Sequence, residues 1–213
     1  MKPSDMPLQR LEQVDVFLDY ENVRRTARQV FLYGSSAEHE GMVDPFDLAR
    51  TLVAKRKRDS TLRNVHVFRG RPNPKRQPKP HSAFEHFAAR WSKNDSIITH
   101  FRDLKYTDYD EDFFTAAEKG VDVALAVQMI NAALGPSRPD AIILMSNDTD
   151  LEPAVEFVLE QTPTHIEIAA WGGEGSYPLY LRKFLNSDSP KHIPYCHFLT
   201  QTDFDRLRCD FKF

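Results

Sequence analysis

Cysteine is almost absent from this chain of 213 residues, which contains only Cys196 and Cys209. Two thiols cannot build the disulfide framework of a small secreted domain, and no further Cys or His stands at zinc-ligand spacing from them. We therefore expect two ordinary, reduced cysteines.

Long apolar runs are also absent. No stretch of about eighteen apolar residues is available to span a bilayer, and residues 1–13 are polar and charged, unlike a signal peptide. These absences predict a soluble, cytoplasmic protein without a membrane partner.

An excess of positive charge is missing too, because 28 Lys and Arg stand against 31 Asp and Glu, for a formal net charge of −3. Affinity for nucleic acid rests mainly on Lys and Arg, so this total alone argues against it. The charges are nevertheless segregated, with basic runs at 55–58 and 69–79 and an acidic run at 106–118. Such segregation allows a basic groove beside an acidic pocket.

Alternating strand and helix patterns dominate what is present. The length and the 41% of apolar residues predict one domain over 1–213, with a core at 14–185 and a C-terminal extension at 186–213. Strand-like runs occur at 14–18, 65–68, 97–101, 141–145, 166–170 and 193–199, and helical patterns at 22–33, 45–57, 82–93, 120–134, 153–161 and 178–185. The alternation predicts an α/β fold whose mostly parallel central sheet is flanked by helices on both faces.

Two segments interrupt this pattern. Residues 34–43 are predicted to form a surface insertion, and the four prolines of RGRPNPKRQPKPH (69–81) predict a stiff, basic loop without regular structure. Two roles remain open for this loop, a solvated connector or a grip on the backbone of a substrate.

The first chemical motif is VDVFLDYENV, an apolar strand that ends at Asp19 before Asn22 and a helix. A carboxylate at the carboxyl end of a central strand faces the cleft of a parallel sheet. The structural alternative is that Asp19 or Asn22 only caps the helix.

The second motif is SNDTDLEP, which sets Ser146, Asp148 and Asp150 after the strand at 141–145. Carboxylates this close raise one another's pKa unless they share a cation. A capping box of Thr149 and Glu152 is the alternative. Pro153 disfavours that box and favours a helix that begins at the proline, which leaves both aspartates in the loop.

The third motif is EKGVDVALAVQMI, an amphipathic helix with Asp122 in its first turn. The helix dipole favours an aspartate there whatever its role. Taken together, DYEN, KGVDVALAV and SNDTDLEP resemble the NYN family, which is related to PIN and LabA-like domains. The resemblance covers roughly residues 14–185, with the order and spacing of the motifs intact.

The resemblance implies a PIN-like three-layer fold and a metal-dependent endoribonuclease that hydrolyses RNA phosphodiester bonds. It implies that four aspartates converge at one edge of the sheet to hold Mg²⁺ or Mn²⁺, and that Asn22 assists them. Asp19 and Asp148 would be the principal ligands. Asp122 and Asp150 would bind the ion through water or orient the nucleophile. Ser146 would contact phosphate or support a ligand. Hard divalent ions prefer such oxygen ligands, and they activate water and neutralise the phosphate.

The chain departs from the family pattern at two places. Gln128 stands where many relatives have a further acid, which puts a second metal ion in doubt, although an amide can still orient water. Tyr20 and Glu21 replace a glycine and its neighbour in the first motif, so that Tyr20 either packs or offers a stacking face.

Substrate contacts are expected first from the basic residues near these motifs: Arg24, Arg25, Arg69, Arg71, Lys75, Arg76 and Lys79, with Arg182 and Lys183 as further candidates. The aromatic residues either stack on unpaired bases or belong to the core: Trp91, Tyr106, Tyr109, Trp171 and Tyr177. WGGEGS (171–176) is either a phosphate cradle or a plain glycine turn, and the turn is favoured.

Three other functions stay open beside the RNA nuclease: a DNA nuclease, a catalytically silent RNA-binding scaffold and a haloacid-dehalogenase phosphatase. DYEN lacks the D-x-D of the last class. A homodimer is compatible with the sequence, which indicates neither the RNA that is cut nor a regulatory partner.

Overall fold

The computed structural model describes residues 10–32, 40–110, 113–181 and 193–209. Its centre is a six-stranded sheet in the order β3-β2-β1-β6-β7-β8, in which every neighbouring pair is parallel. The strands are β1 (Glu12–Asp19), β2 (Ser60–Arg71), β3 (Ile97–Asp103), β6 (Ala141–Met145), β7 (His165–Trp171) and β8 (Cys196–Leu199). The predicted α/β fold with a parallel central sheet is confirmed.

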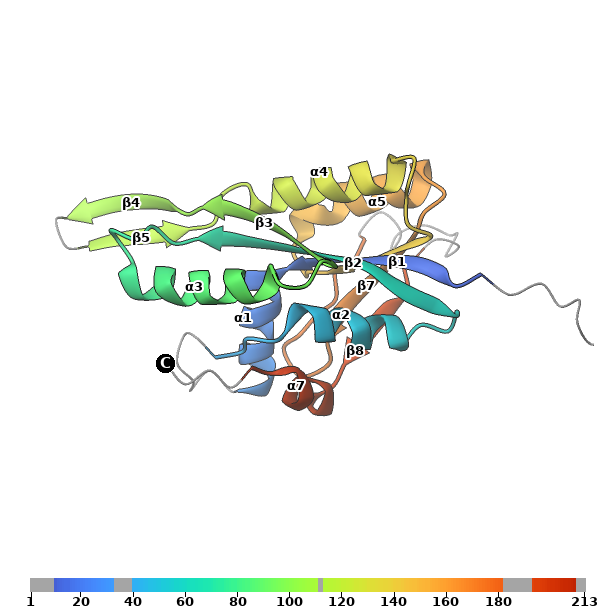
Figure 1. Ribbon diagram of the computed structural model, residues 1–213, viewed down its shortest axis with the longest axis horizontal. Coiled ribbons are helices and arrows are strands. Elements are labelled where there is room, and N and C mark those ends of the chain that lie inside the picture. Colours follow the sequence, from blue (N-terminus) through green and yellow to red (C-terminus); the bar gives the residue numbers. More distant parts are fainter. Residues whose placement is uncertain (1–9, 33–39, 111–112, 182–192, 210–213) are drawn as a thin grey trace, which may run out of the picture.

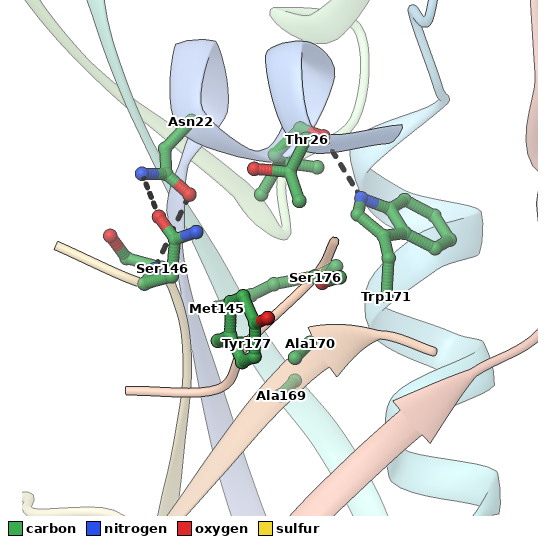
Figure 2. A pocket seen from close by; sticks show the side chains of 11 residues that line it. Asn22, Thr26, Met145, Ser146, Ala169, Ala170, Trp171, Ser176 and Tyr177 are labelled. Carbon is green, nitrogen blue, oxygen red and sulfur yellow. Dashed lines mark hydrogen bonds between the residues drawn. The ribbon is translucent and has the colours of Figure 1, made fainter. Parts of the chain in front are cut away.

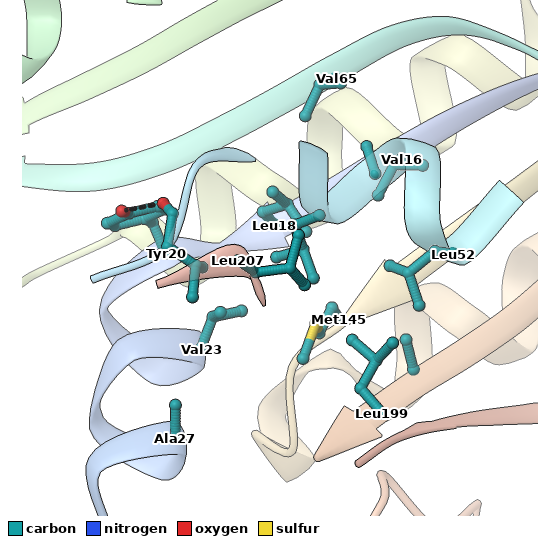
Figure 3. Packing of buried hydrophobic residues seen from close by; sticks show 14 of the residues in the cluster. Val16, Leu18, Tyr20, Val23, Ala27, Leu52, Val65, Met145, Leu199 and Leu207 are labelled. Atoms are coloured by element: carbon teal, nitrogen blue, oxygen red, sulfur yellow. Dashed lines mark hydrogen bonds between the residues drawn. The ribbon is translucent and has the colours of Figure 1, made fainter. Parts of the chain in front are cut away.

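Helices cover both faces of this sheet (Figure 1). One face carries α1 (Tyr20–Phe31), α2 (Pro45–Ala54), α3 (Pro78–Trp91) and α7 (Gln201–Leu207), and the other carries α4 (Val121–Leu134) and α5 (Glu152–Gln161). Successive residues of a strand point to opposite faces, so Val16 and Leu18 pack under the first group while Phe17 packs under the second. Figure 3 shows the first of these two cores around Leu18, Met145 and Leu52.

The amino ends of the strands are held by buried ion pairs. The Arg56 guanidinium donates to both carboxylate oxygens of Glu167 at 3.1 Å, and His197 Nε2 lies 2.6 Å from the same carboxylate. Arg63 in turn donates to the buried Asp15 at 2.8 Å. Each buried carboxylate here has a cationic partner, which offsets the cost of removing its charge from water.

The structure differs from the sequence-based elements in several places. The segment 69–81 is not one irregular loop: β2 continues to Arg71 because that residue pairs with Asp103 of β3, and α3 begins at Pro78 because the first helical position needs no N–H donor. The irregular part is 72–77. Of the predicted surface insertion at 34–43, residues 34–39 lie outside the described residues. Glu40 is exposed, whereas residues 41–43 are buried, and Gly41 adopts φ 87 against the Arg24 carbonyl.

Three further elements were placed wrongly or missed. The helix predicted at 178–185 is absent from 178–181, and the rest of it lies outside the described residues. An antiparallel hairpin of β4 (Lys105–Asp110) and β5 (Phe113–Ala117) forms within the acidic run. The helix α7 was also missed, although a capping box of Thr200 and Asp203 begins it.

No helix within the described residues combines the length and apolar character that crossing a membrane requires.

A matched pair of valines tests where stability resides. Val158 of α5 is fully buried, whereas Val127 of α4 is 50% exposed. Val158→Ala is expected to lower the free energy of unfolding by about 2 kcal/mol or more, because it removes two buried methyl groups and leaves a cavity. Val127→Ala should change it by less than about 0.5 kcal/mol. Urea unfolding of both variants measures the difference, and equal effects would contradict this packing.

Candidate functional site

The candidate site lies where the chain changes direction across the sheet. From β1 the chain runs outward to β2 and β3 on one side and then returns to β6 and β7 on the other. The carboxyl ends of β1 and β6 therefore flank the topological switch point, where parallel α/β sheets form their binding crevices. Asp19 ends β1, and Ser146 follows β6.

Asp19 is the central carboxylate of this site. Only 8% of the residue is exposed, and it caps α1 by accepting a hydrogen bond from the Asn22 backbone N–H at 3.3 Å. The Ser146 hydroxyl donates to its other oxygen at 3.0 Å. The helix-cap alternative for Asp19 is thus real, and it coexists with a position at the switch point.

The loop after β6 brings a second carboxylate toward Asp19. Ser146 Oγ accepts from the Asp148 backbone N–H at 3.1 Å, so one hydroxyl contacts both aspartate residues. Asp148 in turn caps the short 3-10 helix η1 (Thr149–Leu151) by accepting from the Asp150 N–H at 3.0 Å. The alternative of a capping box formed by Thr149 and Glu152, which Pro153 disfavours, is not what the structure shows: Asp148 is the N-cap of η1, and no side chain caps the start of α5. α5 begins at Glu152, one residue before Pro153, so Asp150 lies in η1 and not in an open loop.

Asn22 joins the first helix to this loop. Its side-chain amide donates to the side-chain oxygen Oδ1 of Asn147 at 2.6 Å, and its own Oδ1 accepts from the Asn147 backbone N–H at 3.3 Å (Figure 2). These reciprocal bonds fix the loop that carries Ser146 and Asp148 against the start of α1.

Burial and neighbouring charge make Asp19 reluctant to ionise. Burial raises its pKa from 3.8 to about 6, and the negative charges of Asp148 and Glu21 add to this rise. The hydrogen bonds from Asn22 and Ser146 oppose the shift without cancelling it. A nearby cation would relieve both causes.

Glu118, the first residue of the motif EKGVDVALAVQMI, is an acid of this region that the sequence analysis did not single out as a site residue. Its carboxylate accepts from the Gly70 N–H at 2.5 Å, although the residue as a whole is exposed. Burial of the carboxylate raises its pKa to about 7, and the charges of Glu21 and Asp19 contribute. A Cβ atom on Gly70 would lie 2.8 Å from Glu118 Cγ, so this contact requires glycine. No local signal reveals a contact between positions so far apart in the chain.

The structure does not join every predicted site residue. Asp122 is half-buried in the first turn of α4, and within the described residues it makes no hydrogen bond or ion pair with Asp19, Asp148 or Asp150. Gln128 is exposed and lies about 9 Å further along the α4 axis. In the part of the chain that the structure describes, no group of three or more His, Cys, Asp or Glu side chains is arranged to hold a metal ion.

The predicted basic residues fall into two groups. Arg24 is buried and paired with Glu21 at 2.5 Å, so it stabilises α1 and has no support as a substrate contact. Arg71 and Arg76 are paired with Asp103 and Asp108, which leaves them partly neutralised. The more available cations are Arg25, Lys75 and Lys79, which are all exposed. The Arg69 guanidinium instead lies over the Tyr20 and Phe84 rings, and its Nη1 is buried without a hydrogen-bond partner in the described structure. Arg182 and Lys183 lie outside the described residues.

The aromatic residues divide in the same way. Trp91 and Trp171 are core residues with 2% and 1% exposure, so neither offers a stacking face. Tyr20 also packs in the core, where its hydroxyl donates to the Val43 carbonyl at 2.6 Å. Tyr106 is half-buried against Phe114, whereas Tyr109 and Tyr177 are exposed.

A small pocket adjoins Asp19 on the β7 side (Figure 2). It lies between α1, the carboxyl ends of β6 and β7, and the segment Ser176–Tyr177, and it includes Asn22 and Ser146. The glycine-rich segment before it forms a turn in which the Ser176 N–H donates to the Gly173 carbonyl at 3.2 Å. Gly175 adopts φ 80, so the plain-turn interpretation of this segment agrees with the geometry.

Comparison with known proteins gives one family. The NYN domain family matches residues 13–182, which is most of the chain. No curated protein matches. Among solved structures, a protein of unknown function from Vibrio parahaemolyticus RIMD 2210633 is similar, with 16% sequence identity, a TM-score of 0.47, and coverage of 77% of this chain and 84% of that one.

The pKa of Asp19 predicts a pH-dependent stability. Because its pKa is raised on folding from 3.8 to about 6, Asp19 favours the folded state most below pH 3.8, and this contribution is lost as the pH rises through about 6. Asp19→Asn removes the ionisable group. Without added metal, we expect the variant to exceed wild type in unfolding free energy by up to about 3 kcal/mol at pH 7, and by little at pH 4.

Denaturant unfolding between pH 4 and pH 7 measures this difference, with the exposed Asp95→Asn as the control that should show no such trend. A difference between wild type and Asp19→Asn that stays constant across this range would contradict the burial of an unpaired carboxylate.

Proposed function

This chain belongs to the NYN domain family, and from this membership and the carboxylate site we propose that it is a divalent-metal-dependent endoribonuclease that hydrolyses RNA phosphodiester bonds. The family indicates a nuclease-type function, and NYN nucleases generally depend on divalent metal ions. The choice of RNA over DNA follows the family resemblance.

One observation carries the proposal. Four acidic residues are buried as whole residues in the described part of the chain: Asp15, Asp19, Glu167 and Asp203. Three of them are ion-paired, Asp15 with Arg63, Glu167 with Arg56 and Asp203 with Lys55. Asp19 has no cationic partner in the described structure, and the further negative charge of Asp148 lies close enough to raise its pKa. A buried carboxylate of this kind is costly unless a cation shares the site.

The donor set suits magnesium or manganese. Mg²⁺ in phosphoryl chemistry is commonly held by one or two carboxylates, while water and substrate phosphate complete its shell. Asp19 and Asp148 would supply those carboxylates, so a third protein ligand is not required. A divalent cation bound there would supply Lewis acidity, activating water and neutralising charge that develops on the phosphate.

The other residues of the site have supporting tasks. Ser146 holds the Asp19 carboxylate through its hydroxyl and the Asp148 backbone through its lone pair. Asn22 holds the same loop through Asn147, so the positions of both acids depend on two side chains that bear no charge. We assign Asp150 and Asp122 to outer positions, where they orient water, and Glu118 to the same acidic rim.

Asp148→Asn is expected to abolish cleavage while leaving the fold intact. The amide keeps a carbonyl oxygen that can still cap η1, but it removes the charge that a divalent cation requires. The measurement incubates purified wild type and variant with matched RNA and DNA strands in Mn²⁺, with an EDTA arm, and records circular dichroism alongside.

Asp95→Asn serves as the control. Asp95 is exposed and lies just before β3, at the amino ends of the strands, whereas the candidate site lies at their carboxyl ends. Cleavage by Asp148→Asn at the wild-type rate would remove this residue from the mechanism. Cleavage of DNA alone would replace the proposed substrate, and binding of RNA without cleavage by wild type would favour a silent scaffold.

The exposed lysines beyond β2 are expected to contact the RNA backbone. The double variant Lys75→Ala, Lys79→Ala should weaken binding and reduce the slope of log K against log salt by about 1.4, since each phosphate contact to a single strand contributes about 0.7. Fluorescence anisotropy of labelled RNA between about 50 and 200 mM salt measures this slope.

Lys93→Ala is the matched control, because Lys93 is an exposed lysine at the other end of α3. If the double variant keeps the wild-type salt slope, the 72–77 loop and the start of α3 do not contact the RNA backbone and are a solvated connector.

A further inference from the structure

Arg102 is a cation beside the candidate site that the sequence analysis did not single out. It lies one residue before the end of β3, and its partner in register on β2 is Gly70, whose N–H is bound by Glu118. Arg71 and Arg76 nearby are each paired with an aspartate. Arg102 is exposed, and within the described residues its guanidinium forms no hydrogen bond or ion pair.

Arg102 projects to the same face of the sheet as Asp19. Asp19 is in register with Phe68 of β2, and Phe68 is in register with His100 of β3. Register partners share a face, as do residues two apart in one strand, so Asp19, His100 and Arg102 all project to the face that carries α4. Two strand spacings of about 4.8 Å and an advance of two residues at about 3.3 Å each place the Arg102 Cα atom roughly 12 Å from that of Asp19. One strand of nucleic acid can therefore contact both residues.

The guanidinium of Arg102 lies against the start of α4. β3 ends beside the base of the β4–β5 hairpin and the start of this helix (Figure 1). A Cβ atom built on Gly120 would lie 3.6 Å from Arg102 Nε and 3.8 Å from both Cζ and Nη2, so the guanidinium packs on this glycine. This contact restricts a long side chain before any ligand binds, which lowers the entropy that binding costs.

This position is unfavourable for a positive charge unless an anion is shared. Gly120 is the N-cap of α4 and offers no side chain to the first N–H groups of the helix. The amino end of a helix carries partial positive charge, which favours anions and disfavours cations. Neither Glu118 nor Asp122 forms an ion pair with Arg102 within the described residues. A phosphate group would neutralise the guanidinium and accept its hydrogen bonds.

We infer that Arg102 binds a phosphate group of the RNA strand whose cleaved bond lies at Asp19, on the part of the strand that runs toward β3. The inference rests on the proposed nuclease function, and it gives the direction in which the strand crosses the edge of the sheet. The phosphate at Arg102 undergoes no reaction there. Arginine suits this task because its planar fork can donate two parallel hydrogen bonds to phosphate oxygens.

Binding without cleavage tests Arg102 separately from catalysis. Fluorescein-labelled single-stranded RNA of mixed sequence is titrated in EDTA, and anisotropy at several salt concentrations gives the slope of log K against log salt. Arg102→Ala is expected to reduce this slope by about 0.7, the contribution of one phosphate contact to a single strand. If the two proteins bind equally at about 1 M salt, this change amounts to about eightfold weaker binding at about 50 mM.

Two further variants serve as controls. Arg102→Lys keeps the positive charge and should retain the wild-type slope. Arg138→Ala removes an exposed arginine beyond the other end of α4, and it should leave both slope and affinity unchanged. An equal change of slope in Arg138→Ala would reduce Arg102 to general surface charge and overturn the inference.

Cleavage gives a second measurement. In Mn²⁺, Arg102→Ala should raise KM while kcat is retained, because a contact remote from the cleaved bond is the same in the ground state and the transition state. A fall in kcat at unchanged KM would contradict a role in holding the strand.

The outcomes separate the two proposals. If wild type cleaves no RNA but Arg102→Ala flattens the salt slope and Arg138→Ala does not, Arg102 binds the RNA backbone and the nuclease proposal fails. If wild type cleaves RNA while Arg102→Ala keeps the wild-type slope, the inference about Arg102 fails alone. Absence of measurable RNA binding by wild type at low salt would also overturn it.

Discussion

The arrangement of this site depends on a buried carboxylate, Asp19, that has no cationic partner among the described residues. Asp19 lies at the end of the central strand β1, and the nearest charges that act on it, Asp148 and Glu21, are negative. Hydrogen bonds from Asn22 and Ser146 hold its oxygens in place, but they do not neutralise its charge. A group this costly persists only when the surrounding structure fixes it, and a carboxylate with a strongly raised pKa in a crevice is a candidate for a functional site.

The opposite end of the sheet shows that the fold can neutralise buried acids. Glu167 and Asp15 lie toward the amino ends of their strands, and each meets an arginine at about hydrogen-bond distance. Arg56 and Arg63 thus neutralise acid where no ligand is expected, whereas the carboxyl end keeps its negative charge. Stability and binding are therefore separated along the strands, which agrees with crevices forming at the carboxyl ends of parallel sheets.

The sequence predicts the parts of the site that follow from strand ends. Asp19 and Ser146 each come after an apolar run, so the parallel order alone brings them to one edge, and Pro153 correctly keeps Asp148 out of α5. Glu118 could not be predicted in this way, because its position depends on contact with Gly70. The prolines of 69–81 led us to place Gly70 in a loop, whereas it belongs to β2. The hairpin before it was hidden by its acidic composition, since strand patterns are recognised by apolar alternation.

The loop after β6 joins the carboxylate of Asp19 to the start of α1. Ser146 contacts Asp19, Asn147 contacts Asn22, and both residues also line the uncharged pocket. A displacement of this loop would move an acid of the site and the polar rim of the pocket together, because the same few hydrogen bonds position both. The same hydrogen bonds therefore hold the start of α1 and the loop after β6 in one arrangement, on which the relative positions of Asp19 and Asp148 depend.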